Sequence, residues 1–246
     1  MEDAIRFERV TKSFDGHTVL DEVTFRVPTG SAFCLLGRSG VGKSVTLKLL
    51  IGLLRPDGGD VVVHGRRVPS LSPPDLSALR HRMGFLFQQS ALFDSISLGE
   101  NVAFPLRRNE GLEEAEIRER AERKLEQVGL GGQYDKMPSD LSGGMRKRAG
   151  LARALAMDPQ VLLVDEPSAG LDPITFAEID ELLLSLKKEG GTTMVIVTHN
   201  IPSARRIGDR LALLENGRIH SEGTVSDLEG SEDEMVRHFM RADTGG

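Results

Sequence analysis

The sequence predicts an α/β fold with a mostly parallel sheet core, a small antiparallel β flank and an inserted helical subdomain. Short, mostly apolar runs at residues 30–36, 161–164 and 194–197 have the length of strands covered on both faces, and helical patterns separate them. The first thirty residues alternate apolar and polar positions instead, and residues 88–159 are mostly helical in pattern. We therefore expect a core assembled from two stretches of the chain, with helices inserted between them.

The antiparallel flank comes first along the chain. Residues 5–8 and 23–27 place apolar and polar side chains in turn, which is typical of strands with one face on the core and the other in solvent.

A glycine-rich loop follows the apolar strand at 32–36. It matches the phosphate-binding pattern G-x-x-x-x-G-K-S in full, with residues Gly37, Arg38, Ser39, Gly40, Val41, Gly42, Lys43 and Ser44. The helical pattern at 45–50 supplies the helix N-terminus that such a loop requires. Backbone N–H groups would surround the phosphates, Lys43 would reach the β and γ oxygens, and the Ser44 hydroxyl would ligate Mg²⁺. The loop therefore predicts binding of a nucleoside triphosphate.

The helical insert begins near Gln88 and ends near Pro159. Within it, residues 113–127 carry many charges around an apolar stripe at helical spacing, formed by Ile117, Ala121, Leu125 and the following Val128.

Two carboxylates follow the buried strand at 161–164. Asp165 and Glu166 come at the end of this strand, and open parallel sheets bind their ligands at that edge. Asp165 would hold Mg²⁺ through the coordination shell of the ion, and Glu166 would orient and polarise the attacking water. The alternative is a pair of ordinary acidic residues at a strand end.

The C-terminal part begins with a hairpin and ends in a charged tail. Asn216-Gly217 between two apolar or alternating runs predicts a tight hairpin turn. The tail at 231–246 has apolar residues spaced for one helix face, and we expect its last residues to be frayed. We expect one domain over residues 1–246, with a nucleotide-binding core and flank at 1–87 and 160–230, the helical subdomain at 88–159 and the tail at 231–246.

Composition excludes several classes of protein. The formal net charge is −6, with no global basic field that would attract nucleic acid, and we expect no nucleic-acid partner. The single cysteine, Cys34, excludes an internal disulfide and is expected to be a small buried hydrophobe. No stretch approaches eighteen apolar residues, and the start of the chain lacks the apolar core of a signal peptide. We therefore expect a soluble, cytosolic protein.

The order of motifs along the chain resembles that of the ATP-binding-cassette (ABC) ATPases. The phosphate loop is followed by Gln88 after an apolar strand, Leu-Ser-Gly-Gly at 141–144, Asp165-Glu166, Ser-Ala-Gly-Leu-Asp at 168–172 and Val-Thr-His at 197–199. The resemblance covers nearly the whole chain. It implies a P-loop NTPase with a RecA-like sheet core, which binds ATP and Mg²⁺ and hydrolyses ATP.

The resemblance also implies a role for each matching residue. It makes Gln88 the Q-loop residue, which contacts Mg²⁺ and water and senses the transporter partner, and it makes His199 the switch histidine on the γ-phosphate. The metal ligands would be Ser44, Gln88 and Asp165, and the catalytic residues Glu166, His199 and Gln88. A lone histidine at the end of an apolar strand is otherwise most often a packed residue.

Three further matches concern contacts around the nucleotide. Phe14 matches the aromatic residue that stacks on adenine, with a buried staple in the β flank as the alternative. Ser142, Gly143 and Gly144 resemble the signature loop, which donates to the γ-phosphate held by the other subunit. Asp172 resembles the D-loop residue that couples the two sites. The active unit would then be a head-to-tail homodimer with two ATPs between the subunits.

The signature departs from the family pattern at one position. Met145 stands where the family usually has glutamine, and a thioether cannot offer the hydrogen bonds of an amide. The Ser142 hydroxyl and the glycine N–H groups remain, so we expect the contact with ATP in the other subunit to survive.

Within the family, three segments look most like the ATPases of Mla/Mce-type lipid transporters: residues 141–148, residues 90–95 with 100–106, and residues 172–175. This resemblance implies an ATPase dimer on the cytoplasmic face of the inner or plasma membrane. It would sit under membrane permease subunits, with a lipid-binding Mce-domain protein in the same complex, and move phospholipids between envelope membranes. The tail helix would embrace the partner ATPase or an accessory protein, or alternatively dock on its own domain.

Two other functions fit the same motifs. One is the ATPase of another importer or exporter, because the hydrolytic motifs do not encode the cargo. The other is a soluble cassette protein that acts as a mechanical adaptor in DNA repair, translation or cluster assembly. Such proteins tend to carry a long coiled-coil insert or a second cassette, and this sequence has neither. A small GTPase would give the signature and His199 no role.

Overall fold

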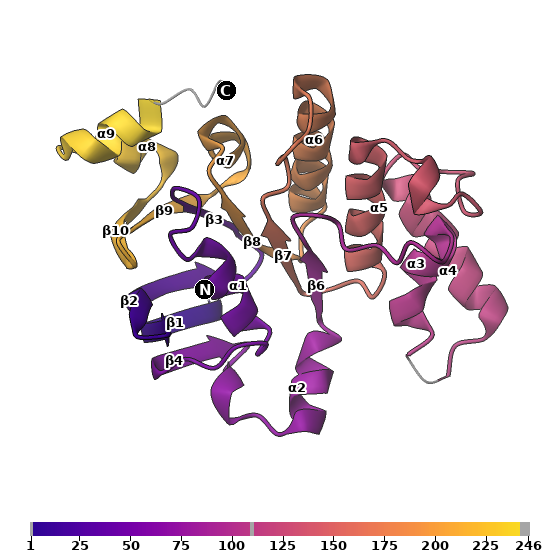
Figure 1. The fold of residues 1–246 in the computed structure, drawn as a ribbon, viewed down its shortest axis with the longest axis horizontal. Coiled ribbons are helices and arrows are strands. Elements are labelled where there is room, and N and C mark those ends of the chain that lie inside the picture. The colour runs from indigo at the N-terminus through magenta and orange to yellow at the C-terminus, as the bar shows by residue number, and fades with distance from the viewer. Residues whose placement is uncertain (1, 109–110, 242–246) are drawn as a thin grey trace. The chain divides into compact units, whose positions relative to one another are not determined.

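The computed structural model describes residues 2–108 and 111–241 (Figure 1), and the chain divides into two compact units. Unit 1 is formed from residues 1–80 and 184–246, and unit 2 from residues 81–183. The chain ends expected to be frayed, 242–246, lie outside the described residues.

Unit 1 begins with the antiparallel flank. The long strand β1 (Asp3–Phe14) pairs with β2 (His17–Pro28) on one side and with β4 (Gly58–Val63) on the other, and β4 also pairs with β5 (Arg66–Arg67). Both runs that alternate in the sequence lie in these strands, as predicted.

Aromatic stacking joins this flank to the next strand of unit 1, β3 (Ala32–Leu36). The ring of Phe25 stacks on Phe7 at a centroid distance of 4.5 Å and on Phe33 of β3 at 4.8 Å. All three rings are buried, so they contribute apolar area as well as the smaller stacking term.

Strand β3 is the centre of the parallel part of unit 1. It pairs in parallel with β8 (Thr193–Thr198) and with β9 (Arg210–Glu215), and β10 (Arg218–Gly223) runs antiparallel to β9. Every residue of β3 and β8 is buried, which explains why these runs do not alternate in polarity.

The turn between β9 and β10 is the predicted Asn-Gly hairpin. Asn216 has φ 48° and Gly217 has φ 76°, so both central residues are left-handed, as a type I′ turn requires.

Short helices accompany the strands of unit 1 and are α1 (Lys43–Leu50), α2 (Pro73–Arg80), α7 (Ile201–Ile207), α8 (Val225–Glu229) and α9 (Glu234–Arg241), with a 3₁₀ turn at Val68–Ser70. The tail helix α9 packs against α8 of the same chain and buries Val236 and Met240.

Unit 2 contains two parallel strands, β6 (Met83–Leu86) and β7 (Val161–Asp165), with Leu86 opposite Val164. Its helices α3 (Leu98–Leu106), α4 (Glu114–Gln127) and α5 (Gly143–Leu155) pack against one another (Figure 1), and a 3₁₀ turn lies at Pro138–Asp140. Helix α6 (Pro173–Glu189) leads the chain from unit 2 back into unit 1. These elements confirm the predicted α/β class with an antiparallel flank and inserted helices.

The helical stripe predicted for α4 is confirmed, because Ile117, Ala121 and Leu125 are all buried.

The start of α3 is tied down by a polar cluster. The Tyr134 hydroxyl donates to Glu100 Oε1 at 3.0 Å, and Arg107 forms ion pairs with both Glu100 and Glu114.

The one cysteine of the sequence lies in the middle of β3. Cys34 is fully buried, and its thiol donates to the carbonyl oxygen of Ala204 with an S–O distance of 3.9 Å. The expectation of a small buried side chain is confirmed.

Within the described residues, no helix combines the length and the apolar character needed to cross a bilayer.

Candidate functional site

The predicted phosphate-binding loop connects β3 to α1 within unit 1. Gly37 comes so close to β9 that a Cβ there would lie 2.6 Å from the carbonyl oxygen of Leu214. Gly42, at φ 113°, precedes α1, and a Cβ there would lie 2.9 Å from Leu20 Cδ2. The close approach to the β9 backbone therefore requires glycine at position 37, and the left-handed backbone at position 42 requires glycine there.

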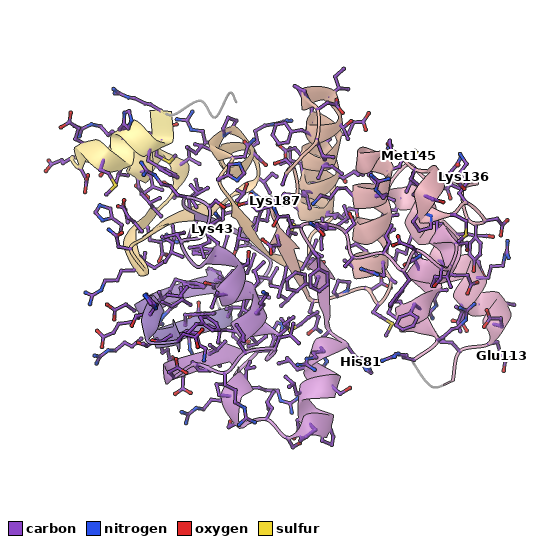
Figure 2. All side chains as sticks on the ribbon, viewed as in Figure 1. Lys43, His81, Glu113, Lys136, Met145 and Lys187 are labelled. Atoms are coloured by element: carbon purple, nitrogen blue, oxygen red, sulfur yellow. The ribbon has the colours of Figure 1, made fainter. Side chains whose placement is uncertain are left out.

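Lys43 begins α1, and its position is labelled in Figure 2. Its Nζ donates to the carbonyl oxygens of Gly37 at 2.8 Å and Arg38 at 3.1 Å, and the residue is only 5 % exposed. The ammonium group is thus held at the centre of the loop, where an anion enclosed by the loop N–H groups would meet it.

The start of α1 is suited to an anion. Gly42 has no side chain with which to cap the first N–H groups, and the first turn of α1, which contains Ser44, holds no acidic residue. The positive end of the helix dipole and these N–H groups are therefore directed at the loop.

His199 lies beside the phosphate loop. It follows β8 directly, and together with Gly37, Arg38, Ser39 and Val41 it lines a pocket of about 520 Å³ within unit 1. Residues Met235, His238 and Phe239 of the tail helix line the same pocket. The structure thus brings together the predicted phosphate loop and the predicted γ-phosphate histidine.

Phe14 ends β1 with 39 % of its surface exposed, and the Lys12 ammonium lies 5.3 Å from its ring centroid. This exposure is incompatible with the alternative of a buried staple. Stacking of Phe14 on adenine stays a prediction.

Unit 2 holds the predicted acidic residues at one edge of its strand pair. Asp165 ends β7, Glu166 follows it, and Gln88 comes two residues after the end of β6. Because β6 and β7 are parallel, their carboxyl ends meet at one edge, where α/β proteins place ligands. Asp165 is 7 % and Glu166 8 % exposed, so both carboxylates are largely withdrawn from solvent.

A buried lysine joins two of these residues. Lys147 of α5 is 3 % exposed, and its Nζ donates to the main-chain carbonyl oxygens of Gln88 and, at 3.2 Å, of Glu166. Burial lowers the pKa of Lys147 to about 8, against the opposing effect of the negative charges of Asp165 and Glu166.

The signature segment forms the N-terminus of α5. The Ser142 side chain is the N-cap and accepts from the backbone N–H of Met145 at 3.2 Å. This cap uses only the main chain of Met145, whose position at the start of α5 is labelled in Figure 2, so the missing glutamine amide does not weaken it.

The signature segment lies against Thr175, which bonds to the residue predicted to couple the two ATP sites. A Cβ on Gly144 would collide with the Thr175 side chain, and Thr175 Oγ1 donates to Asp172 Oδ2 at 2.6 Å. Asp172 Oδ1 in turn accepts from the N–H groups of Ile174 and Thr175, both at 3.1 Å, at the start of α6. The hydrogen bonds from Thr175 hold the pKa of the Asp172 carboxyl below its usual range.

Two of these residues were not predicted from the sequence. Thr175 carries the contact between Gly144 and Asp172, and Lys147 carries the contact between α5 and the strand ends. A cation on the otherwise apolar face of α5 is a sequence signal that points to Lys147. No sequence signal points to Thr175.

The predicted metal ligands carry the donor atoms that Mg²⁺ prefers. Ser44 supplies a hydroxyl oxygen from unit 1, and Asp165 and Gln88 supply carboxylate and amide oxygens from unit 2. Within the part of the chain that the structure describes, no three histidine, cysteine or acidic side chains gather as an all-protein metal cage. A set of a few oxygen donors fits Mg²⁺, which keeps waters and substrate phosphates in its shell.

The family model described as "ABC transporter" matches residues 20–169. Among curated proteins, the probable ribonucleotide transport ATP-binding protein mkl of Mycobacterium leprae is 44 % identical over 96 % of this chain and 68 % of its own length. The methionine import ATP-binding protein MetN of Caulobacter vibrioides is 41 % identical over 98 % of this chain and 73 % of its own. The intermembrane phospholipid transport system ATP-binding protein MlaF of Escherichia coli K12 is 38 % identical over 90 % of this chain and 82 % of its own length.

Two solved structures are also similar to this chain. The dimeric ATP-binding cassette MJ0796, bound to ADP and Pi in a post-hydrolysis state, is similar with a TM-score of 0.83 and 32 % identity over 89 % of this chain and 98 % of that one. The protein cbiO1 of Clostridium perfringens, part of the ABC transporter complex cbiONQ, has a TM-score of 0.83 and 29 % identity over 97 % of this chain and 99 % of that one.

Proposed function

The chain belongs to the ABC transporter family and is an ATPase of that family, and on this basis we propose that it works as a dimer that powers a membrane permease for phospholipids or related lipids. The family, the P-loop NTPase fold and the ATPase activity predicted from the order of motifs are confirmed. The cargo, the partners and the role of each site residue belong to the proposal.

The residues of the site divide the work of ATP hydrolysis. Lys43 and the N–H groups of the loop bind the phosphates, and His199, which shares a pocket with that loop, holds the γ-phosphate and the water. Glu166 orients and polarises the water, with Gln88 beside it at the same edge of the strand pair. The observation that carries this proposal is the presence of His199 in the same pocket as Gly37, Arg38 and Ser39.

We propose Mg²⁺ as the metal, with Ser44, Asp165 and Gln88 as its protein ligands. When bound, Mg²⁺ neutralises the charge that builds up on the phosphates. The three residues supply hydroxyl, carboxylate and amide oxygens, and the buried position of Asp165 suits a carboxylate that is paired with a cation.

Dimerisation completes the site. Ser142 and Gly143 are exposed at the N-terminus of α5, where helix N–H groups and a hydroxyl can meet the γ-phosphate of ATP held by a second copy. ATP then binds the closed dimer better than the open one, and hydrolysis releases it. Asp172, which is tied to the signature segment through Thr175, couples the two sites.

The lipid cargo is supported by the likeness to MlaF together with the segments at 90–95, 100–106, 141–148 and 172–175. We propose that the dimer sits on the cytoplasmic face of the inner or plasma membrane, under permease subunits, in a complex with an Mce-domain lipid-binding protein. The likeness to cbiO1, part of a multi-protein ABC transporter complex, supports a partnership with other subunits.

A second candidate is the ATPase of an importer of small polar solutes. The similarity to MetN, which spans 98 % of this chain, favours it, and the mycobacterial relatives carry a ribonucleotide transport name. The site cannot separate these cargoes, because Lys43, Glu166 and His199 act on ATP in either case.

The partners decide between the two. The tagged chain is purified from its native cells in mild detergent, and co-purifying proteins and lipids are identified by mass spectrometry. Recovery of a permease, an Mce-domain protein and bound phospholipid is the expected result. Recovery of a permease with a solute-binding protein and no lipid would overturn the lipid cargo and leave the ATPase intact.

A further inference from the structure

One buried side chain of helix α5 bonds to two of the segments of unit 2 that carry proposed catalytic residues. Lys147 extends from α5, and its ammonium group meets two main-chain carbonyl oxygens that belong to different segments, those of Gln88 and Glu166. Gln88 lies just beyond β6 and Glu166 just beyond β7. One side chain therefore links three segments that carry residues of the proposed hydrolytic site.

A lysine is an unusual choice for this position. Burying an ammonium group costs free energy unless its donors are satisfied, and an apolar side chain would fill the same space on α5 without that cost. Here both of the named acceptors are carbonyls of residues proposed to act in hydrolysis, and the carboxylates of Asp165 and Glu166 are near enough to favour the charge. Lys147 therefore lacks the stability that an apolar side chain would add by packing, and it forms two directed hydrogen bonds instead.

The bond to Glu166 holds a strained residue. Glu166 has φ 45°, a left-handed conformation that is strained for a non-glycine residue. The direction of its side chain and the direction of its carbonyl are both set by that backbone conformation. A donor that holds the carbonyl therefore also holds the Cα–Cβ direction from which the carboxylate that is to orient water extends.

The segment after Gln88 is held by the same helix. Arg153, further along α5, donates to the carbonyl oxygens of Ser90 at 2.8 Å and Ala91 at 2.7 Å. Ser90 and Ala91 also have left-handed φ values of 62° and 49°. The loop that follows Gln88 thus keeps its irregular backbone through bonds from α5.

The other end of α5 is the signature segment. Ser142 caps the helix, and Lys147 lies little more than one turn beyond it. Because a capped α-helix is stiff over such a short length, a displacement of Ser142 also displaces Lys147.

We propose that Lys147 is a positioning residue for hydrolysis, which couples the place of the signature helix to the orientation of Glu166 and Gln88. The inference rests on the proposed roles of these two residues. The hydrogen bonds of Lys147 to them go to their main-chain carbonyl oxygens, so Lys147 acts through these residues. The water-orienting geometry is then complete only while α5 is in place.

The test compares two substitutions of Lys147 with a matched control. Lys147→Met removes the donors and keeps most of the side-chain volume, and Lys147→Arg keeps a cation that donates. The control is Lys124→Met on α4 of the same unit, which removes the ion pair between Lys124 and Asp158. The ATPase kcat and KM, the Kd for ATP at equilibrium and the urea midpoint of unfolding are measured for each.

If Lys147 positions the catalytic residues, Lys147→Met lowers kcat on the order of 10²-fold while KM and the Kd for ATP change less than about threefold. Lys147→Arg restores a large part of kcat, and Lys124→Met leaves it unchanged. Combined with Glu166→Gln, Lys147→Met adds little to the loss, because both substitutions disable the same step.

An unchanged kcat in folded Lys147→Met would overturn the inference. A structural role would also overturn it. In that case the loss of kcat accompanies a fall in the urea midpoint, and the fold-loss in the double variant with Glu166→Gln equals the product of the two single fold-losses. If Lys147→Met does not fold, Lys147→Gln carries the same measurements with one neutral donor. Wild-type turnover in Glu166→Gln alone would instead overturn the proposed role of Glu166.

Discussion

The ammonium group of Lys43 donates a 2.8 Å hydrogen bond to the carbonyl oxygen of Gly37, at the opposite end of the same loop. The side chain that is to bind phosphate therefore also closes the loop around the place where phosphate would lie. Lys43 therefore both holds the loop in shape and supplies the positive charge that would meet the phosphate.

Replacing Lys43 should weaken nucleotide binding. In Lys43→Ala the loop loses its central cation, and a hydrogen bond to a charged group contributes about 1.5–3 kcal/mol, so we expect the Kd for ATP to rise at least about tenfold. Equilibrium binding of a fluorescent ATP analogue measures this. Lys48→Ala, an exposed lysine on the same helix, is the control and should bind as wild type does. An unchanged affinity in Lys43→Ala would contradict the assigned phosphate contact.

Replacing Glu166 should separate ATP binding from turnover. Glu166→Gln keeps the size of the side chain but cannot polarise water as a carboxylate does, so we expect kcat to fall by about 10²–10⁴-fold. ATP binding should remain, and size-exclusion chromatography with ATP should show a trapped dimer. The assignment fails if the variant turns over ATP as wild type does.

The contact between Gly144 and Thr175 should be visible in stability. Gly144→Ala forces a methyl group into the Thr175 side chain, and overpacking of this kind costs about 1–3 kcal/mol in the free energy of unfolding. The neighbouring Gly143→Ala is the matched control, because its Cβ would lie an ordinary 3.6 Å from Leu171 Cδ2. Urea unfolding compares the two, and equal stabilities would show that α5 and α6 yield freely at this contact.

The cluster around Glu100 should make stability depend on acid. The hydrogen bond from Arg107, and then that from Tyr134, lower the pKa of Glu100 from 4.5 in spite of partial burial. A carboxyl with a depressed folded-state pKa stabilises the protein above its unfolded pKa, and this contribution is lost as the pH falls through the folded value.

The difference in unfolding free energy between wild type and Glu100→Gln should therefore be largest at neutral pH and shrink below pH 4.5. Urea unfolding over a pH series measures it. Glu122→Gln, which removes a surface pair with Arg118, is the control and should remain close to wild type throughout. A difference that does not change with pH would remove the acid dependence from Glu100.

Sequence patterns predicted those parts of the fold that have a strong local cause. The Asn216-Gly217 hairpin, the phosphate loop and the buried stripe of α4 each depend on residues that are close in sequence. The stacked rings of Phe7, Phe25 and Phe33 depend on three separate strands, and no local pattern specifies which rings meet.

The same division holds for the site. Motif residues such as Lys43, Asp165 and Glu166 were predicted, because their chemistry requires particular residue types in a particular order. Lys147 and Thr175 were not, because Lys147 bonds to segments 59 and 19 residues away and Thr175 meets Gly144 of another helix, and a lysine or threonine in a helix is ordinary by itself. Met145 is harmless to the helix cap because the cap uses its backbone, a fact that only the fold reveals.

The complete burial of Cys34 in β3 makes the wild-type chain a ready background for thiol labelling. An introduced surface cysteine will be the only thiol that reacts readily with a dye or spin label, because Cys34 is fully buried and the reagent cannot reach it. Leu53 in unit 1 and Ile174 in unit 2 are 55 % and 76 % exposed and accept such labels without loss of core packing. Resonance-energy transfer or pulsed electron resonance between them would then report the separation of the two units at each stage of ATP turnover, with no cysteine having to be removed first.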